Sequence, residues 1–174
     1  IKHELEKSKH SPKSAIVIGS LGRVGSGVID LCEKMNIKMT KWDVLETSKK
    51  QDFSEILDHD LFFNCVVANK ETPTFISEGI IRRNQNLTIV GDIACDPGSR
   101  YNPIAIYDAV TTWSEPVARV SENPILEVMA IDNLPSLLPL ESSVDFASQL
   151  LPTLLELDRL EEGVWLRAHQ TYLD

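Results

Sequence analysis

The sequence is short of the features that mark several large classes of protein. It holds three cysteines, Cys32, Cys65 and Cys95, spaced far apart and without a CxxC pair, so we expect neither a thiolate metal site nor a disulfide framework. No apolar run approaches the ~20 residues of a membrane span. The polar opening, IKHELEKSKH, does not resemble a secretory signal. We therefore expect reduced cysteines, with Cys32 and Cys65 packed inside, and a cytoplasmic location.

Positive charge is also scarce. The chain has 26 acidic residues against 17 basic ones, for a formal net charge of −9. Such a surface repels phosphate backbones, which excludes nucleic acid as an expected partner. Any phosphate-bearing ligand must then be held by local backbone geometry. The 174 residues suffice for one substantial domain, and an opening without Met, in the middle of a pattern, indicates a piece of a longer protein.

Apolar patterning predicts an alternation of strands and helices. Short apolar stretches rich in β-branched residues are typical of strands, and they cover residues 14–19, 37–44, 61–68, 87–93 and 125–131. Helical spacing covers residues 23–35, with further helices at 53–57, at 72–80 and, as two helices divided at Pro152, over 137–160. Residues 97–124 indicate a long irregular connection. The pattern favours an α/β fold, a Rossmann-like doubly wound parallel sheet with helices on both faces.

A glycine cluster joins the first predicted strand to the first helix. Gly19, Gly22 and Gly25 form a GxxGxxG sequence, with Gly27 close behind. Glycine allows the tight turn, while Gly22 would let a pyrophosphate approach the backbone and Gly25 would let the helix lie close to the sheet. The phosphates would then bind the free N–H groups at the helix N-terminus.

Asp43 ends the second predicted strand, where a carboxylate can accept hydrogen bonds from both adenosine ribose hydroxyls. Taken by itself, Asp43 fits equally well as a cap of the following turn. Lys41, Lys49 and Lys50 lie nearby and would favour a 2′-phosphate, but Asp43 would repel that phosphate at close range. We interpret the lysines as solvated surface and predict NAD as the cofactor.

Several segments carry a resemblance to a known family. GSLGRVGSGVIDL, KWDVLETS, FFNCVV, VGDIACDP and IDNLPSLLPLESS resemble the lysine-forming saccharopine dehydrogenases of fungi, from about Lys13 to Arg167. More distantly, the pattern is similar to the alanine dehydrogenase group. The resemblance implies an NAD-dependent enzyme that cleaves saccharopine to lysine and 2-oxoglutarate, the last step of the α-aminoadipate route to lysine, with no membrane partner.

The resemblance also implies a cofactor site. Gly22 and Arg23 would meet the pyrophosphate, Asp43 and Thr47 the adenosine ribose, and Val67 the adenosine side of the cleft. The nicotinamide end would be bordered by Ile93 and by a segment of four residues, which are Ile131, Asp132, Asn133 and Leu134. The family commonly has His at position 133, and because Asn cannot titrate near neutral pH we assign Asn133 no acid–base role.

No catalytic residue and no metal ligand is assigned to this chain. The family's acid–base pair, a Lys and a His, belongs to an N-terminal domain that we expect to be missing here, and His3, His10, His59 and His169 are not candidates for it. We accordingly predict an entry segment at 1–13, the NAD-binding domain at 14–160, and a C-terminal segment at 161–174 that packs toward the missing domain. The fragment alone should be inactive.

Two alternatives stay open. One is the nucleotide domain of another alanine-dehydrogenase-like enzyme that acts on a different amino acid. The other is a non-catalytic NAD-sensing module, which the absence of an acid–base pair would fit.

Overall fold

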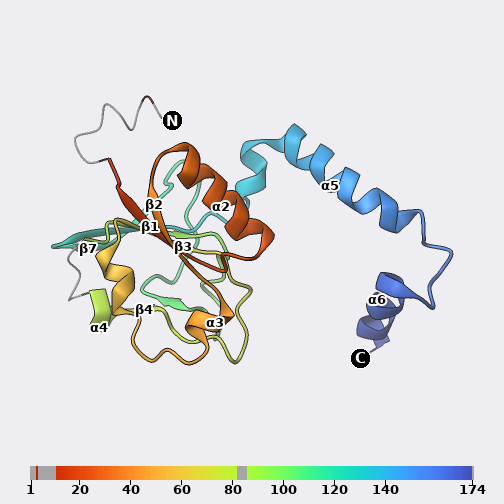
Figure 1. The fold of residues 1–174 in the computed structure, drawn as a ribbon, viewed down its shortest axis with the longest axis horizontal. Coiled ribbons are helices and arrows are strands. Elements are labelled where there is room, and N and C mark those ends of the chain that lie inside the picture. Colours follow the sequence, from red (N-terminus) through yellow and green to blue (C-terminus); the bar gives the residue numbers. More distant parts are fainter. Residues whose placement is uncertain (1–2, 4–10, 82–85, 174) are drawn as a thin grey trace. The chain divides into compact units, whose positions relative to one another are not determined.

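The computed structural model describes residue 3, residues 11–81 and residues 86–173. The chain divides after Asp132 into two compact units (Figure 1). The domain boundary expected at residue 160 stays a prediction. No helix in the described ranges combines the length and the apolar character that a membrane span requires.

The first unit is built on a six-stranded sheet of order β2-β1-β3-β5-β8-β7. Five strands run parallel, and β7 pairs antiparallel with β8 at one edge. Their bounds are β1 Ser14–Ile18, β2 Lys38–Trp42, β3 Leu61–Asn64, β5 Ile89–Asp92, β7 Ala118–Glu122 and β8 Ile125–Met129. A separate pair of short strands, β4 Ile76–Ser77 and β6 Ile104–Ala105, is also parallel. The predicted Rossmann-like α/β fold is confirmed.

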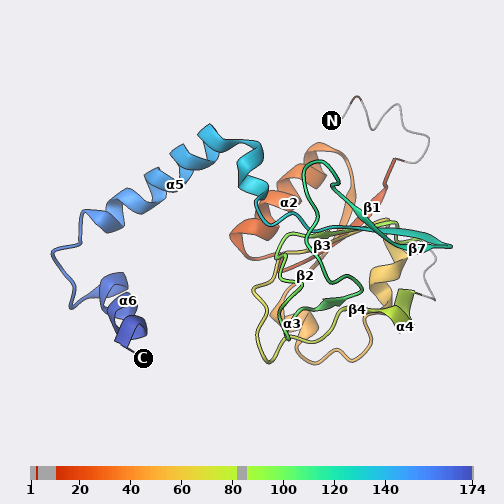
Figure 2. The same ribbon diagram turned by 180° about the vertical axis from the view of Figure 1, so that it is seen from behind.

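Strand β1 shows how the sequence divides the core between the two faces of the sheet. Because side chains alternate along a strand, Ala15 and Val17 pack with the buried side of α2, Arg23–Lys34, on one face. Ile16 and Ile18 pack on the other face with side chains of η1, Ser54–Asp58, and α4, Glu78–Ile81. Both faces are thus covered by helices, as the two opposite views show (Figures 1 and 2).

Helix α2 ends in a well-defined cap. Asn36 adopts a left-handed conformation with φ 56°, its N–H donates to the Glu33 carbonyl, and the N–H of Ile37 donates to the Cys32 carbonyl at 2.9 Å. This is a Schellman motif, with Asn in the position that usually favours Gly or Asn. The motif turns the chain directly into β2, and Ile37, just before that strand, is buried against the α2 face.

The two edges of the sheet carry charged side chains. On β7, Arg119 donates to Glu127 of the neighbouring strand at 2.7 Å and to Glu122 at 3.2 Å. On β2, Lys38 and Lys41 are exposed. Both edge strands of the six-stranded sheet therefore carry charged side chains.

Some predicted elements are wrong in detail. The region predicted as irregular, 97–124, holds β6 and the edge strand β7. The helix predicted from residue 72 begins only at Glu78, because the N–H groups of Phe75 and Ile76 donate to the Pro103 carbonyl and draw the segment into the small sheet. Strand β3 stops at Asn64 instead of residue 68. The helix predicted at 53–57 is a 3₁₀ turn, η1.

The second unit consists of helices. A 3₁₀ turn, η2 Leu134–Leu137, leads into α5, Pro139–Leu154, and α6 follows at Gly163–Leu173. The predicted break at Pro152 is wrong: α5 continues through Pro152 and ends two residues later, so the proline lies in the last turn. The indole N–H of Trp165 donates to the Thr153 carbonyl at 2.8 Å. No side chain among residues 133–173 is buried.

Candidate functional site

The carboxyl ends of the central parallel strands lie side by side at one end of the sheet. The register pairs Trp42 with Ile18, Ile18 with Asn64, and Asn64 with Asp92, while Gly91 pairs with Met129 of β8. The chain leaves β1 for β2 on one side and later returns to β3 on the other, which makes the β1–β3 junction the switch point where open parallel sheets bind ligands. The predicted cofactor residues of the first unit follow these strand ends.

The glycine loop is tied to the end of β2 by its backbone. The N–H groups of Gly19 and Ser20 both donate to the Trp42 carbonyl, at 3.0 and 3.1 Å. The N–H of Leu21 donates to Asp43 Oδ2 at 2.9 Å. Asp43 and the loop are thus brought together, as the sequence predicts, and in addition they are joined by a hydrogen bond that it does not predict.

The backbone and packing require glycine at some positions of the loop and not at others. Gly19 has φ +87°, and a Cβ at Gly25 would lie 2.1 Å from the Gly19 carbonyl oxygen, so the fold itself requires both. A Cβ at Gly22 would make only an ordinary contact of 3.4 Å, and one at Gly27 would meet nothing within 4 Å. The exposed Gly22, the N-cap of α2, is therefore not fixed by packing within the described residues.

A pocket of about 190 Å³ lies beside the loop, between the end of β2 and the segment after β3. It brings together three of the predicted adenosine-side residues, Asp43, Thr47 and Val67. Thr47 is buried, whereas the Val67 side chain is 95% exposed. The remaining lining residues are Val44, Ser48, Val66, Asn69, Glu71, Thr72, Pro73 and Phe75.

Asp43 also caps a helix, as the alternative interpretation expects. Its Oδ1 accepts from the N–H of Val44 at 2.9 Å, and its own N–H donates to Glu46 at 2.7 Å, which starts the short helix α3, Val44–Thr47. The Thr47 hydroxyl donates to the Asp43 carbonyl. The capping box adds the Glu46 N–H as a third backbone donor to the Asp43 side chain, beside those of Leu21 and Val44. A carboxylate has about four acceptor positions, so some acceptor capacity remains on Asp43.

Two of the neighbouring lysines have acidic partners. Lys41 pairs with Glu33 of α2 at 3.6 Å, and Lys50 pairs with Glu55 at 3.1 Å while its ammonium lies 4.2 Å from the Trp42 ring centroid. These contacts engage the two charges with groups of the protein itself. They match the interpretation of these lysines as surface residues better than a role in binding a phosphate.

The predicted nicotinamide-side residues lie in both units. Ile93 follows β5, is partly buried, and its N–H donates to the Asn64 carbonyl at 3.0 Å. Ile131 is buried just beyond β8, and Asp132 is exposed. Asn133 is exposed, and Leu134, partly buried, begins η2 in the second unit.

A buried polar network at the same strand ends was not predicted. Asp92 Oδ1 accepts from the Asn64 amide at 2.8 Å and from the Cys95 N–H at 3.2 Å, while Oδ2 accepts from the Tyr107 hydroxyl at 2.6 Å. Burial, together with the hydrogen bond to Asp92, raises the pKa of Tyr107, so its hydroxyl stays protonated. In the sequence, Asn64 and Asp92 stand out as polar residues at the ends of apolar strands, which could have indicated the network. Nothing in the sequence around Tyr107 indicates its part in it.

His59 and the three cysteines lie in packed parts of the first unit. His59 is buried, with Nε2 2.7 Å from the Thr40 hydroxyl and Nδ1 3.0 Å from the Glu55 carbonyl. Burial raises the pKa of Cys65 to about 12 and, with nearby carboxylates, that of Cys95 to about 11. All three cysteines are free. Cys32 is buried, as predicted, whereas Cys65, which was also predicted to pack inside, is only partly buried. His10 lies outside the described residues.

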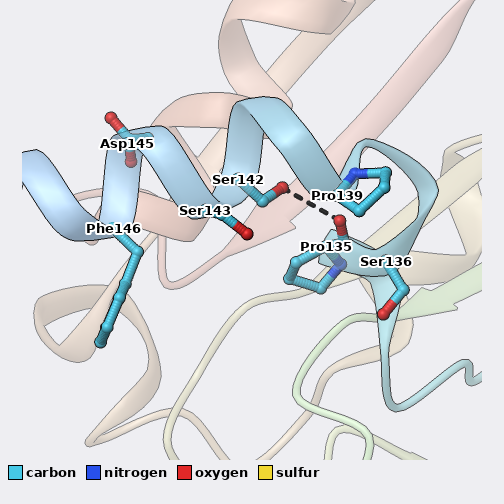
Figure 3. A pocket seen from close by; sticks show the side chains of 7 residues that line it. All are labelled: Pro135, Ser136, Pro139, Ser142, Ser143, Asp145 and Phe146. Carbon is cyan, nitrogen blue, oxygen red and sulfur yellow. Dashed lines mark hydrogen bonds between the residues drawn. The ribbon is translucent and has the colours of Figure 1, made fainter.

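The second unit has a hollow of its own, of about 510 Å³, at the start of α5. Figure 3 shows the Ser142 hydroxyl turned toward the Pro135 carbonyl, to which it donates at 3.0 Å. The other lining residues are Ser136, Pro139, Ser143, Asp145 and Phe146. None of them is a predicted cofactor residue.

Comparison with known proteins gives a consistent set of relatives. The chain is 44% identical to the saccharopine dehydrogenase (NAD, L-lysine-forming) of Candida albicans over 99% of its length, 40% identical to that of Schizosaccharomyces pombe over 97%, and 37% identical to that of Neurospora crassa over 99%. It spans about half the length of these relatives, 48% in each case. The resemblance predicted from the sequence is confirmed.

A family match covers most of the chain. Residues 46–171 match the alanine dehydrogenase/PNT C-terminal domain. The match includes β3, β5, β8 and the helices of the second unit, while the glycine loop and Asp43 precede it. On the strength of this match, the chain belongs to the alanine dehydrogenase/PNT C-terminal domain family.

Proposed function

We propose that this chain is the NAD-binding half of an NAD-dependent saccharopine dehydrogenase that forms L-lysine. Two observations together carry the proposal. The chain is similar over nearly its whole length to enzymes of that name, and its candidate cofactor residues follow the carboxyl ends of the parallel strands. The proposed reaction converts saccharopine, NAD⁺ and water to L-lysine, 2-oxoglutarate, NADH and a proton. The free thiols agree with the expected cytoplasmic location.

The geometry at the carboxyl ends of the strands fits a dinucleotide. Gly22 is exposed and is not required by internal packing, which supports a role in admitting a pyrophosphate to the backbone. Helix α2 has no acidic residue in its first turn and no side-chain cap, so N–H groups at its N-terminus and the positive end of its dipole are suited to phosphate. The adjacent pocket would receive the adenosine, with Val67 as apolar contact for the base.

The chain's own residues would bind and orient the cofactor. Asp43 would accept from the adenosine ribose hydroxyls while holding the glycine loop through Leu21, and Thr47 would border the same ribose. Ile93, Ile131, Asp132, Asn133 and Leu134 would shape the nicotinamide end. When bound, NAD supplies the two-electron oxidant for the carbon–nitrogen bond of the substrate.

Proton transfer is proposed to lie outside these 174 residues. Asn133 carries no titratable proton near neutral pH, and His59 is engaged on both ring nitrogens. The other half of the full-length protein would supply a Lys and a His for acid–base work, together with the contacts that select saccharopine. Such groups typically contribute ~10²–10⁴-fold to rate, so the chain alone should bind NAD without turning over saccharopine.

The test is calorimetric titration of NAD and NADP into the chain and into its Asp43→Ala variant. We expect NAD affinity to fall about tenfold or more, because a hydrogen bond to a charged group is lost. NADP affinity should fall less, since the repulsion of the 2′-phosphate is lost as well, so the NAD/NADP ratio drops. The shared cost of freeing Leu21 cancels in that ratio.

A matched control is Asp30→Asn, which removes the same charge from an exposed position on α2 and should leave the ratio unchanged. An unchanged ratio in Asp43→Ala would show that Asp43 is only a cap. Assays of the full-length protein with saccharopine and with alanine then separate the proposed activity from that of another amino-acid dehydrogenase. Binding of NAD without activity on any amino acid would favour the sensing module.

A further inference from the structure

The buried carboxylate at the end of β5 is costly to keep. Asp92 is 0% exposed, and a carboxylate in that position is tolerated only when its oxygens are well hydrogen-bonded. Three donors from three different parts of the chain supply these bonds: the Asn64 amide on β3, the Cys95 N–H after β5, and the Tyr107 hydroxyl from the connection to β7.

The network leaves one polar atom without a partner. Asn64 Oδ1 is buried and accepts no hydrogen bond within the described residues. The amide cannot be turned to relieve this, because its oxygen would then face Asp92 Oδ1 in place of its NH₂ group. Since well-packed apolar residues are often as stable as buried charged networks or more so, stability alone does not account for this arrangement.

What the network holds is the segment that follows β5. The N–H groups of Ile93 and Ala94 both donate to the Asn64 backbone carbonyl, at 3.0 and 3.3 Å. Cys95 is held at φ 48°, a left-handed conformation that a non-glycine residue adopts at a cost. Its N–H reaches Asp92 Oδ1 in that conformation. Side chain and backbone at the two strand ends thus fix residues 93–95 together.

We propose that Asp92, supported by Asn64 and Tyr107, is a positioning residue that holds segment 93–95 in the shape that receives the nicotinamide half of the cofactor. The inference rests on the proposed function and deepens it, because Ile93 is the residue proposed to border the nicotinamide ribose. The glycine loop and the adenosine pocket are built from β1, β2 and the segment after β3, so the network should act on one half of the dinucleotide only.

The experiment compares two ligands on the 174-residue chain. ADP carries the adenosine and both phosphates, whereas NAD adds the nicotinamide half. In Asp92→Ala, we expect NAD affinity to fall about tenfold and in Tyr107→Phe about threefold, magnitudes that correspond to losing positioning hydrogen bonds. ADP affinity should stay within a factor of about two in both variants. Tyr107→Phe removes a single hydroxyl and so tests the idea even where Asp92→Ala does not fold.

Two further variants serve as controls. Asp92→Asn should restore most of the NAD affinity, because its amide oxygen can accept from Asn64 and Cys95 while its NH₂ group donates to Tyr107. Asp108→Asn removes an equal charge from an exposed position next to Tyr107 and should bind NAD normally. A parallel loss of ADP and NAD affinity, or no loss of either, would overturn the inference. A wild-type chain that binds neither ligand would overturn the proposed function, and this inference with it.

Discussion

Residues 11–132 and residues 133–173 are both rich in apolar side chains, yet only the first region buries them. The sheet has two faces. Helix α2 packs on one face and η1 and α4 pack on the other, so that the side chains of the sheet are buried in two cores. Helix α5 is longer than any helix of the first region, but no residue in it is buried. Leu137, Leu140 and Phe146 are more than half exposed. Apolar content alone therefore does not make a core, which requires a second layer at the right distance.

The contrast is tested most severely by one matched pair of phenylalanines. Phe62→Ala removes a fully buried ring that packs edge-on against Phe75, and should lower the free energy of unfolding by about 3–5 kcal/mol. Phe146→Ala removes a ring that is 66% exposed, and should change it by less than about 0.5 kcal/mol. Urea unfolding followed by Trp42 fluorescence, with Trp113 and Trp165 replaced by Phe in both variants and in the reference chain, measures both. Equal losses would mean that Phe146 is packed as tightly as Phe62.

A second pair lies within the first region, on one helix. Gly25→Ala would place a Cβ 2.1 Å from the Gly19 carbonyl oxygen and should destabilise the chain by about 1–3 kcal/mol. Gly27→Ala meets nothing within 4 Å and should stabilise it by about 0.5–1 kcal/mol, because Ala is the better helix former. Thermal unfolding of the two variants should therefore shift in opposite directions. Shifts of the same sign would contradict the close approach of α2 to the loop.

Helix α5 gives a prediction for the second region alone. Pro152 has no N–H to donate in the last turn of α5, so Pro152→Ala should increase helical circular dichroism at 222 nm and strengthen that turn by about 1 kcal/mol, less than the ~3 kcal/mol of a mid-helix proline. The unfolding midpoint reported by Trp42 as the sole tryptophan, which belongs to the first region, should stay the same. A shifted midpoint at Trp42 would show that the two regions unfold as one cooperative unit.

The last effect concerns alkaline pH and should arise in the first region, where all three cysteines lie. Burial raises the pKa of Cys65 from 9.0 to about 12 and that of Cys95 to about 11, so the folded chain keeps protons that the unfolded chain releases. The contribution of the protonated thiols to the free energy of unfolding is fully present below about pH 9, and it is lost as the pH rises through the pKa values of the folded chain. Cys65→Ser should lose less stability than the wild type between about pH 9 and 10.5, as measured by urea unfolding. An identical pH dependence would show that Cys65 titrates normally.

The sequence was most informative where local pattern and tertiary packing agree. The unit of β1, the glycine loop, α2 and β2 was predicted nearly to its bounds. Its apolar residues form a continuous run in β1, recur at helical spacing in α2 and alternate with polar residues in β2. Asp43 was found through its place at the end of β2. These features depend on neighbours in the sequence, which a pattern can show.

Features that depend on distant neighbours were missed. Strand β7 has the sequence ARVSE, in which only Ala118 and Val120 are apolar. Because an edge strand buries little, this alternation is too short to stand out from the surrounding irregular segment. Tyr107 lies in a segment without periodicity, and only the folded chain brings its hydroxyl to Asp92. Pro152 predicts a break, yet only two residues of α5 follow it, so its missing N–H and its ring disturb little of the helix, which continues through it. For β7 and Tyr107, the deciding contact is with residues that are distant in the sequence.

The charged residues at the two sides of the sheet have a consequence for how the chain behaves among other copies of itself. A strand with a free side exposes N–H and C=O groups that can pair with a strand of another molecule and so begin aggregation. On β7, the Arg119 ion pairs with Glu122 and Glu127 place charges that an incoming strand would have to desolvate, and Lys38 and Lys41 do the same on β2. The fold thus limits its own lateral growth at high concentration by side chains that contribute little to its stability.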